Sequence, residues 1–195
     1  MSLKTVKQLL VDELKDIYDA EHRLTKALPK LAKAANDEAL GEAFNGHLRQ
    51  TEEHVVRLEK VFEALGETPK RKTCKAMVGL LEEGASIMEE AAAPGIKDLL
   101  LIAGAQKVEH YEMATYGCLR TWAQLLGEGQ VVKLLQQTLD EEGAADKKLT
   151  SIAMAIQQDE PREDEAEMDD AEHAILASGS ARSKGSRTSA REAKH

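Results

Sequence analysis

The sequence is poor in aromatic residues and has no excess of positive charge. Aromatic residues make up 3% of the 195-residue chain, and the formal net charge is -9 at pH 7. Nucleic-acid binding needs either a concentrated basic surface for phosphates or stacking rings for single strands. We therefore expect no nucleic acid as the main partner.

Cysteines and long apolar segments are also scarce. Cys74 and Cys118 are the two cysteines, far apart and without CxxC spacing, which argues against a disulfide framework or a sulfur-ligated zinc site. The longest apolar stretch, 99–105, is far shorter than the roughly 20 residues that cross a bilayer. The first apolar stretch carries acidic residues and lacks the features of an export signal. We expect a cytoplasmic protein with no membrane partner.

Apolar residues return every three or four positions throughout residues 3–157, and no strand-like alternation occurs. The spacing predicts four long helices, at 3–33, 37–65, 97–126 and 130–157. Asn36 and Asp37 are expected to cap the second of them, and a shorter helix, 74–92, lies in the long connection that follows it. Two antiparallel helical hairpins joined by one crossover are typical of an all-α, ferritin-like four-helix bundle.

The composition changes after residue 158. Residues 159–172 are strongly acidic, and the chain from Ser178 onward is rich in Ser, Arg and Lys, with little apolar material to bury. We expect one ferritin-like domain at 1–158 and a disordered charged tail at 159–195.

Polar groups interrupt the apolar face of each long helix, although an ionised group costs several kcal/mol to bury without compensation. On three of the helices the interruptions are all carboxylates: Glu21, Glu109, Glu112, Glu142 and Asp146. They fall within a turn of the midpoint of their helices, and midpoints meet in an antiparallel bundle. The simplest interpretation is a single polar layer inside the core.

The second helix adds imidazoles to this layer. At 100° per residue, His47, Gln50 and His54 share one flank of its apolar stripe. No Lys or Arg is expected on the inward stripes near this level, because Lys107 and Arg49 point roughly opposite to it. The counter-charge must therefore come from elsewhere.

Two divalent cations would supply this counter-charge. They carry +4 against a formal -5 from the five carboxylates, and carboxylates with one or two imidazoles suit iron or manganese. The alternative is a metal-free core of protonated acids, hydrogen-bonded to one another or to Tyr18 and Tyr116, because burial raises carboxyl pKa values. We favour the dinuclear centre because the arrangement resembles the facing Glu and Glu-His ligands of such bundles.

Four segments resemble a known family. They are YDAEHRLTKALPKLAKAA, CKAMVGLLEEG, LIAGAQKVEHYEMATYGCL and LLQQTLDEEGAADKKL, beginning at Tyr18, Cys74, Leu101 and Leu134. On these segments, residues 3–157 are identified as a member of the YciF family of bacterial stress-response proteins, within the ferritin-like superfamily. The resemblance implies a dimetal carboxylate site, induction under stress and a homodimer.

The resemblance also implies ligands, position by position. Glu21, Glu109, Glu112 and Glu142 match the carboxylate ligands of the family, and Asp146 takes the place of the second ligand on the last helix. The family commonly has Glu where this chain has Gln50, a neutral side chain that bridges metals poorly. The predicted metal ligands are Glu21, Gln50, His54, Glu109, Glu112, Glu142 and Asp146.

Three functional hypotheses follow. In the first, two iron ions, with manganese or zinc as alternatives, react with a small oxidant such as peroxide or dioxygen. In the second, the bundle sequesters metal or stabilises a partner without turnover, and Gln50 leaves the site impaired or empty. In the third, the chain is a metal-free helical interaction module. The sequence leaves enzyme or binding protein open and assigns no catalytic residue.

Overall fold

The computed structural model describes the backbone of residues 3–159 and the side chains of residues 3–156. All regular elements within this range are helices. The helices are α1 (Val6–Ala34), α2 (Glu38–Ala64), α3 (Lys75–Glu89), α4 (Pro94–Leu125) and α5 (Gly129–Asp159). Each helix end lies within three residues of its expected position. The tail at 160–195 lies outside the described residues, so its disorder and the domain boundary at 158 stay predictions.

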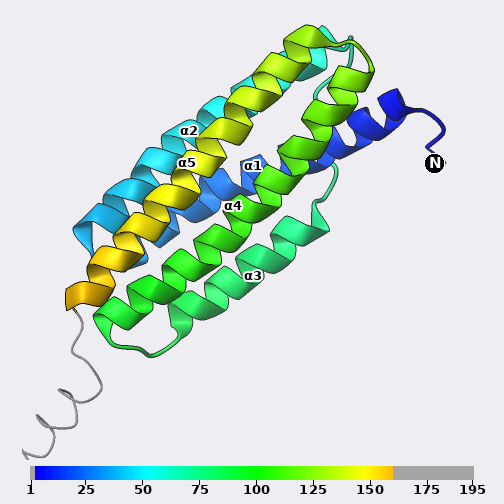
Figure 1. Cartoon of the computed structure of the whole chain (residues 1–195). Coiled ribbons are helices and arrows are strands. Elements are labelled where there is room, and N and C mark those ends of the chain that lie inside the picture. The colour runs from blue at the N-terminus through cyan, green and yellow to red at the C-terminus, as the bar shows by residue number, and fades with distance from the viewer. Residues whose placement is uncertain (1–2, 160–195) are drawn as a thin grey trace, which may run out of the picture. The chain divides into compact units, whose positions relative to one another are not determined.

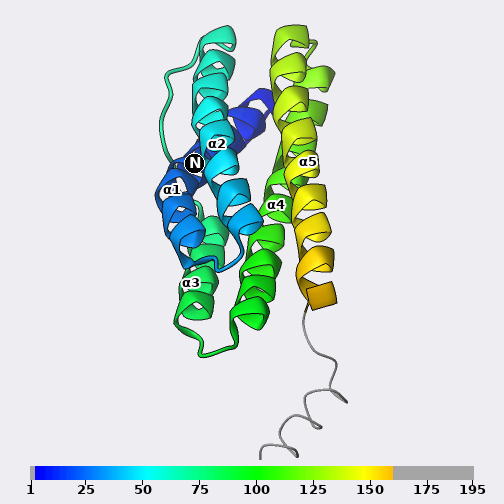
Figure 2. The ribbon, with the colours of Figure 1, turned by 90° about the vertical axis from the view of Figure 1, so that its left-hand side faces the viewer.

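The four long helices form two antiparallel hairpins, α1 with α2 and α4 with α5 (Figure 1). α1 also contacts α4, while α5 is bonded to α2 through Arg57 and Thr138 and to α4 through Gln106 and Asp146. α3 lies along α1 and α4, outside the four-helix core (Figure 2). The predicted ferritin-like bundle with a crossover helix is confirmed. None of the described helices is both long and apolar enough to cross a membrane.

Local sequence signals set where the hairpins turn. At the start of α2, the Asp37 carboxylate accepts a hydrogen bond from the backbone N–H of Leu40 at 2.8 Å, as expected for an N-cap. α2 and α4 are followed by Gly66 and Gly127, whose φ angles of 70° and 76° lie in the left-handed region. Glycine adopts this conformation without strain, which lets both helices end sharply.

Asp19 on α1 fastens the crossover to the bundle. Its carboxylate accepts hydrogen bonds from the backbone N–H of Cys74 and from Arg71 Nε, each at 2.9 Å, and it pairs with Arg23 at 2.6 Å. Burial would raise the pKa of Asp19, but these donors hold it below its ordinary value. Because Cys74 caps α3, this carboxylate fixes where α3 begins along α1.

Asp98, near the start of α4, fastens the turn between α1 and α2. Its buried carboxylate accepts hydrogen bonds from the backbone N–H groups of Asn36 at 2.9 Å and Asp37 at 2.7 Å. These donors precede the first turn of α2, where a helix cannot supply acceptors of its own. One carboxylate therefore joins three helices at one end of the bundle.

Replacing Asp98 with alanine is expected to lower the free energy of unfolding by roughly 2 to 4 kcal/mol, because two backbone donors lose a charged acceptor. Urea unfolding of the metal-free protein measures this loss. Glu52→Ala is the control, since Glu52 is exposed on α2, and its effect should stay within about 0.5 kcal/mol. An Asp98→Ala loss no larger than that of the control contradicts the role given to Asp98.

Candidate metal centre

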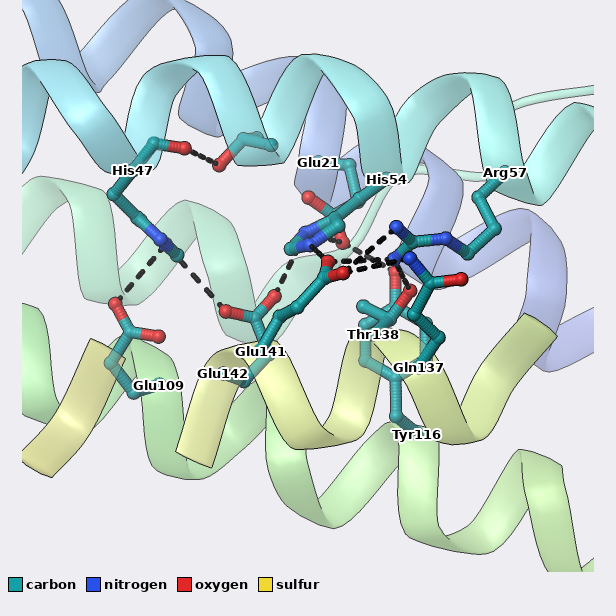
Figure 3. A network of polar contacts seen from close by, with 11 residues as sticks. Glu21, His47, His54, Arg57, Glu109, Tyr116, Gln137, Thr138, Glu141 and Glu142 are labelled. Carbon is teal, nitrogen blue, oxygen red and sulfur yellow. Dashed lines mark hydrogen bonds and ion pairs between the residues drawn. The ribbon is translucent and has the colours of Figure 1, made fainter. Parts of the chain in front are cut away.

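Six polar side chains from the four long helices meet inside the apolar core and form a polar cluster, of which Figure 3 labels all but Glu112. They are Glu21 of α1, His47 and His54 of α2, Glu109 and Glu112 of α4, and Glu142 of α5. None is more than 7% exposed. The predicted polar layer therefore exists, and it draws on both hairpins.

Helical spacing explains how α2 presents two imidazoles. His47 and His54 are seven residues apart, so they lie on nearly the same face and are separated by about two turns. Glu142 of α5 lies between them: its Oε2 is 3.7 Å from His47 Nε2, and its Oε1 is 3.0 Å from His54 Nδ1. One carboxylate thus faces both imidazoles (Figure 3).

The polar cluster divides into two groups of metal-ligating atoms that share Glu142. The groups are His47, Glu109, Glu112 and Glu142, and Glu21, His54 and Glu142. Within each group the ligand atoms lie within 4.8 Å of one another. His47 Nε2 is 3.2 Å from Glu109 Oε1, and His54 Nδ1 is 3.6 Å from Glu21 Oε1. The arrangement suits two neighbouring cations with a shared carboxylate.

Many polar atoms of the cluster are buried without a hydrogen-bond partner among the described residues. Both oxygens of Glu112 and of Glu142 are in this state. His54 Nδ1 approaches Glu142 to 3.0 Å, but not in hydrogen-bond geometry. Each such atom costs about 1–3 kcal/mol, and native proteins contain few of them. Cations would satisfy these oxygens and nitrogens together, so the residues present fit a metal centre.

The pKa values of the cluster reflect this burial. Burial, followed by the charge of neighbouring carboxylates, raises the pKa values of Glu109 and Glu112 well above 4.5, and burial also raises the pKa of Glu21. For Glu142, the imidazoles of His54 and His47 outweigh burial and lower the pKa. Without metal, protons therefore neutralise part of the cluster.

Glu141 and Arg57 orient His54 from outside the cluster. Glu141 Oε2 lies 2.8 Å from His54 Nε2, and Arg57 binds both oxygens of Glu141, at 2.8 and 3.1 Å. Burial opposes ionisation of Glu141, but Arg57 and Gln137 hold its pKa below the ordinary value. An ionised Glu141 places the imidazole proton on Nε2, which leaves Nδ1 facing the cluster as a ligand atom.

Metal-free His54 binds a second proton readily. Burial alone would lower its pKa, but the carboxylates of Glu142 and Glu21 raise it to about 11. Tyr116 donates a hydrogen bond to Glu21 Oε1, and burial followed by the charge of Glu21 raises the pKa of this phenol well above 10. Tyr116 therefore stays a neutral donor that fixes Glu21.

The structure brings five of the seven predicted ligands together: Glu21, His54, Glu109, Glu112 and Glu142. It places Asp146 outside the cluster, where Oδ1 accepts a hydrogen bond from Gln106 at 3.0 Å and lies 3.3 Å from His110 Nε2. Four residues beyond Glu142, the helix has turned by about 40° more than a full circle. That rotation directs Asp146 toward α4.

Gln50 also lies outside the cluster. Its half-buried side chain lines an opening of about 460 Å³ between α2 and α5, which reaches His47 and Glu109. On α2, His47 belongs to the cluster instead of the predicted ligand Gln50. The seven-residue spacing of His47 and His54 was the sequence signal for this residue, although the predicted ligand set did not include it.

The expectation that no Lys or Arg would point inward near the polar cluster is wrong for Arg57. Its side chain is buried one helical turn from His54, but both of its contacts are with α5, at Glu141 and Thr138. It therefore neutralises Glu141 and leaves the carboxylates of the cluster without a cationic partner from the described Lys and Arg residues.

Of the two groups in the polar cluster, the one with His47 and Glu109 borders two cavities. The opening between α2 and α5 reaches His47 and Glu109, and so does a second cavity, of about 300 Å³, among α1, α3 and α4. Glu21 and His54 are completely buried and line neither. A small molecule would therefore approach the group that contains His47 and Glu109.

Comparisons with known proteins agree with the sequence resemblance. The family described as "Domain of unknown function (DUF892)" matches residues 5–161. Protein YciF of Escherichia coli (strain K12) is 44% identical over 155 residues, 79% of this chain and 93% of that protein.

Solved structures give the same result. The crystal structure of the E. coli stress protein YciF has a TM-score of 0.79 at 43% identity, covering 81% of this chain and all of that one. YcfI from Rhodopseudomonas palustris has a TM-score of 0.75 at 40% identity, covering 76% and 95%. With its ferritin-like bundle, its match to the DUF892 family over residues 5–161 and its identity to YciF, the chain belongs to the YciF family.

Proposed function

We propose that the polar cluster holds two divalent metal ions and that the protein is a stress-response metalloprotein reacting with peroxide or dioxygen. The observation that carries the proposal is the burial of four glutamates without a Lys or Arg partner among the described residues. Four carboxylates carry a formal charge of -4, and two divalent ions carry +4. Metal therefore balances the cluster without a fifth acid.

The donor set supports iron or manganese. Each group offers carboxylate oxygens and one imidazole, a mixture that suits these metals, although zinc also accepts it. Four carboxylates and two histidines are also the inventory of two-metal sites in other ferritin-like bundles. Here both imidazoles come from α2, whereas in those sites they come from two helices.

Each residue of the cluster has a distinct role around such a centre, either with one metal ion or with both. His47, Glu109 and Glu112 would hold one ion, Glu21 and His54 the other, and Glu142 would contact both. Iron or manganese would supply redox chemistry that side chains lack. The apolar core excludes water from the Glu21 half, while the openings at Glu109 and His47 admit a small oxidant to the other half.

Elemental analysis of protein loaded with manganese or iron, with excess metal removed, tests the site. About two ions per chain are expected for the unaltered protein. Glu142→Ala should remove both because Glu142 belongs to both groups, whereas His47→Ala should remove one. Gln50→Ala and Asp146→Ala are the controls and should retain both ions, since neither side chain lies in the cluster. A metal-free result for the unaltered protein, or equal losses in all four variants, contradicts the assignment.

Hydrogen peroxide consumption separates turnover from sequestration. Protein loaded with manganese or iron is expected to consume peroxide at least tenfold faster than the Glu109→Ala variant treated in the same way. Zinc-loaded protein is the matched control, because zinc fills a similar site but has no redox chemistry. Equal rates with zinc and manganese would rule out redox turnover, and retention of two ions without consumption would indicate metal sequestration.

The stability of the metal-free protein should depend on pH through the raised carboxyl pKa values. Folded Glu109 and Glu112 hold protons above the pKa of 4.5 at which the unfolded chain loses them. Their contribution to stability is thus fully present below pH 4.5 and is lost as the pH rises through their folded pKa values. Each extra proton gives a slope of roughly 1.4 kcal/mol per pH unit.

Urea unfolding between pH 5 and pH 8, with chelator present, measures this decline. Glu112→Gln should show a shallower decline than the unaltered protein, because its amide does not titrate. Glu52→Gln, on the exposed face of α2, should leave the decline unchanged. A stability that rises with pH in this interval, or equal slopes for all three proteins, would contradict the predicted protonation of the cluster.

A further inference from the structure

The cavity of about 300 Å³ among α1, α3 and α4 has a mainly apolar wall. Its lining includes Leu24 and Leu28 of α1, Leu80 and Ile87 of α3, and Leu101 of α4. Small-molecule sites in proteins are typically concave and apolar, with a few polar groups, and reach volumes of this order. The cavity has the size and lining of a ligand site.

Positive charge gathers at the outer part of this cavity, on the cationic rim formed by Arg23, Lys26, Lys30 and Arg71. Asp19 pairs with both arginines, at 2.6 and 2.8 Å, and offsets one of their charges. Lys26 and Lys30 are exposed and form no ion pair with the described carboxylates. Four cations against Asp19 leave a formal +3 at the rim, on a chain whose net charge is -9.

The inner part of the cavity differs from its rim. Its buried polar lining consists of His47 and Glu109, and Glu109 is the one acidic residue among those that line the cavity. From outside to inside, the surface thus changes from cationic to apolar and then to one edge of the polar cluster. The cationic rim and the apolar wall behind it match a ligand with an anionic head and an apolar body.

We propose that this cavity binds an amphipathic carboxylate, with its head at Lys26 and Lys30 and its apolar body between α3 and the bundle. The rim attracts an anion, and the apolar wall gains free energy in proportion to the ligand surface removed from water. The end of the body points toward Glu109 and His47. Binding depends on the cavity and its rim, so it does not require the proposed metal centre.

Gly84 of α3 offers a way to close the cavity. It lines the cavity, and a Cβ atom added to it would meet no atom within 4 Å, so a larger side chain there has room to occupy the free volume. Gly79 is equally free of neighbours on the same helix, but it is exposed and does not line the cavity. The two glycines form a matched pair for substitution.

Calorimetric titration of the full chain with straight-chain carboxylates of eight to twelve carbons, below their micelle concentrations, tests the proposal. Affinity should rise by up to about fourfold for each added methylene until the cavity is filled. Alcohols and trimethylammonium compounds of the same chain length should bind at least tenfold more weakly. No saturable binding, or equal affinity for all three head groups, would overturn the proposal.

Substitutions at the cavity and at its rim test whether the carboxylate binds there. Gly84→Leu should weaken carboxylate binding at least tenfold, whereas Gly79→Leu should leave it unchanged. The double variant Lys26→Glu with Lys30→Glu should weaken binding of the carboxylate but not of the alcohol, and Lys33→Glu, exposed on the same helix outside the cavity, is its control. Equal effects of Gly84→Leu and Gly79→Leu would overturn the site.

Titrations with metal-free and manganese-loaded protein separate this proposal from the metal function. Saturable binding in both states supports the cavity whether or not the cluster retains metal. Binding that appears only after metal loading, and that Gly84→Leu leaves intact, would place the carboxylate on the metal and overturn the cavity proposal. Failure of metal to bind would contradict the proposed function alone.

Discussion

The structure depends on how the charge of four glutamates buried at the centre of the core is compensated. Buried carboxylates need either protons or cations to compensate their charge, and none of the described Lys and Arg side chains pairs with these four. Because α1 and α2 contribute on one side and α4 and α5 on the other, the cluster exists only when the two hairpins pack together. Metal binding at the proposed centre would therefore depend on assembly of the bundle.

The cluster is asymmetric, and the crossover contributes to this asymmetry. Glu21 and His54 are sealed within the core, while Glu109 and His47 border two openings. One of these openings exists because α3 lies along α1 and α4, where Asp19 fixes its start. The same helix that connects the hairpins thus builds a cavity against the accessible half of the cluster. The position of α3 therefore determines both the connection between the hairpins and one of the openings to the cluster.

Helix period and cap residues were sufficient to predict the bundle, but not the direction of every polar side chain. Glu142 and Asp146 are four residues apart and differ by about 40° on the helix, and only the positions of α2 and α4 decide which one faces the cluster. For the same reason Gln50 borders an opening while His47 enters the cluster. Pairing of Arg57 with a residue on α5 depends on a long-range contact that periodicity does not report.

X-ray diffraction from crystals of the manganese-loaded protein, recorded at the manganese absorption edge, tests most directly whether the buried carboxylates are held by cations. We expect two anomalous peaks inside the bundle, both in contact with Glu142. A map without an anomalous peak among the buried carboxylates, or with peaks only at exposed acidic residues, would show that protons alone neutralise the core and would contradict the metal centre.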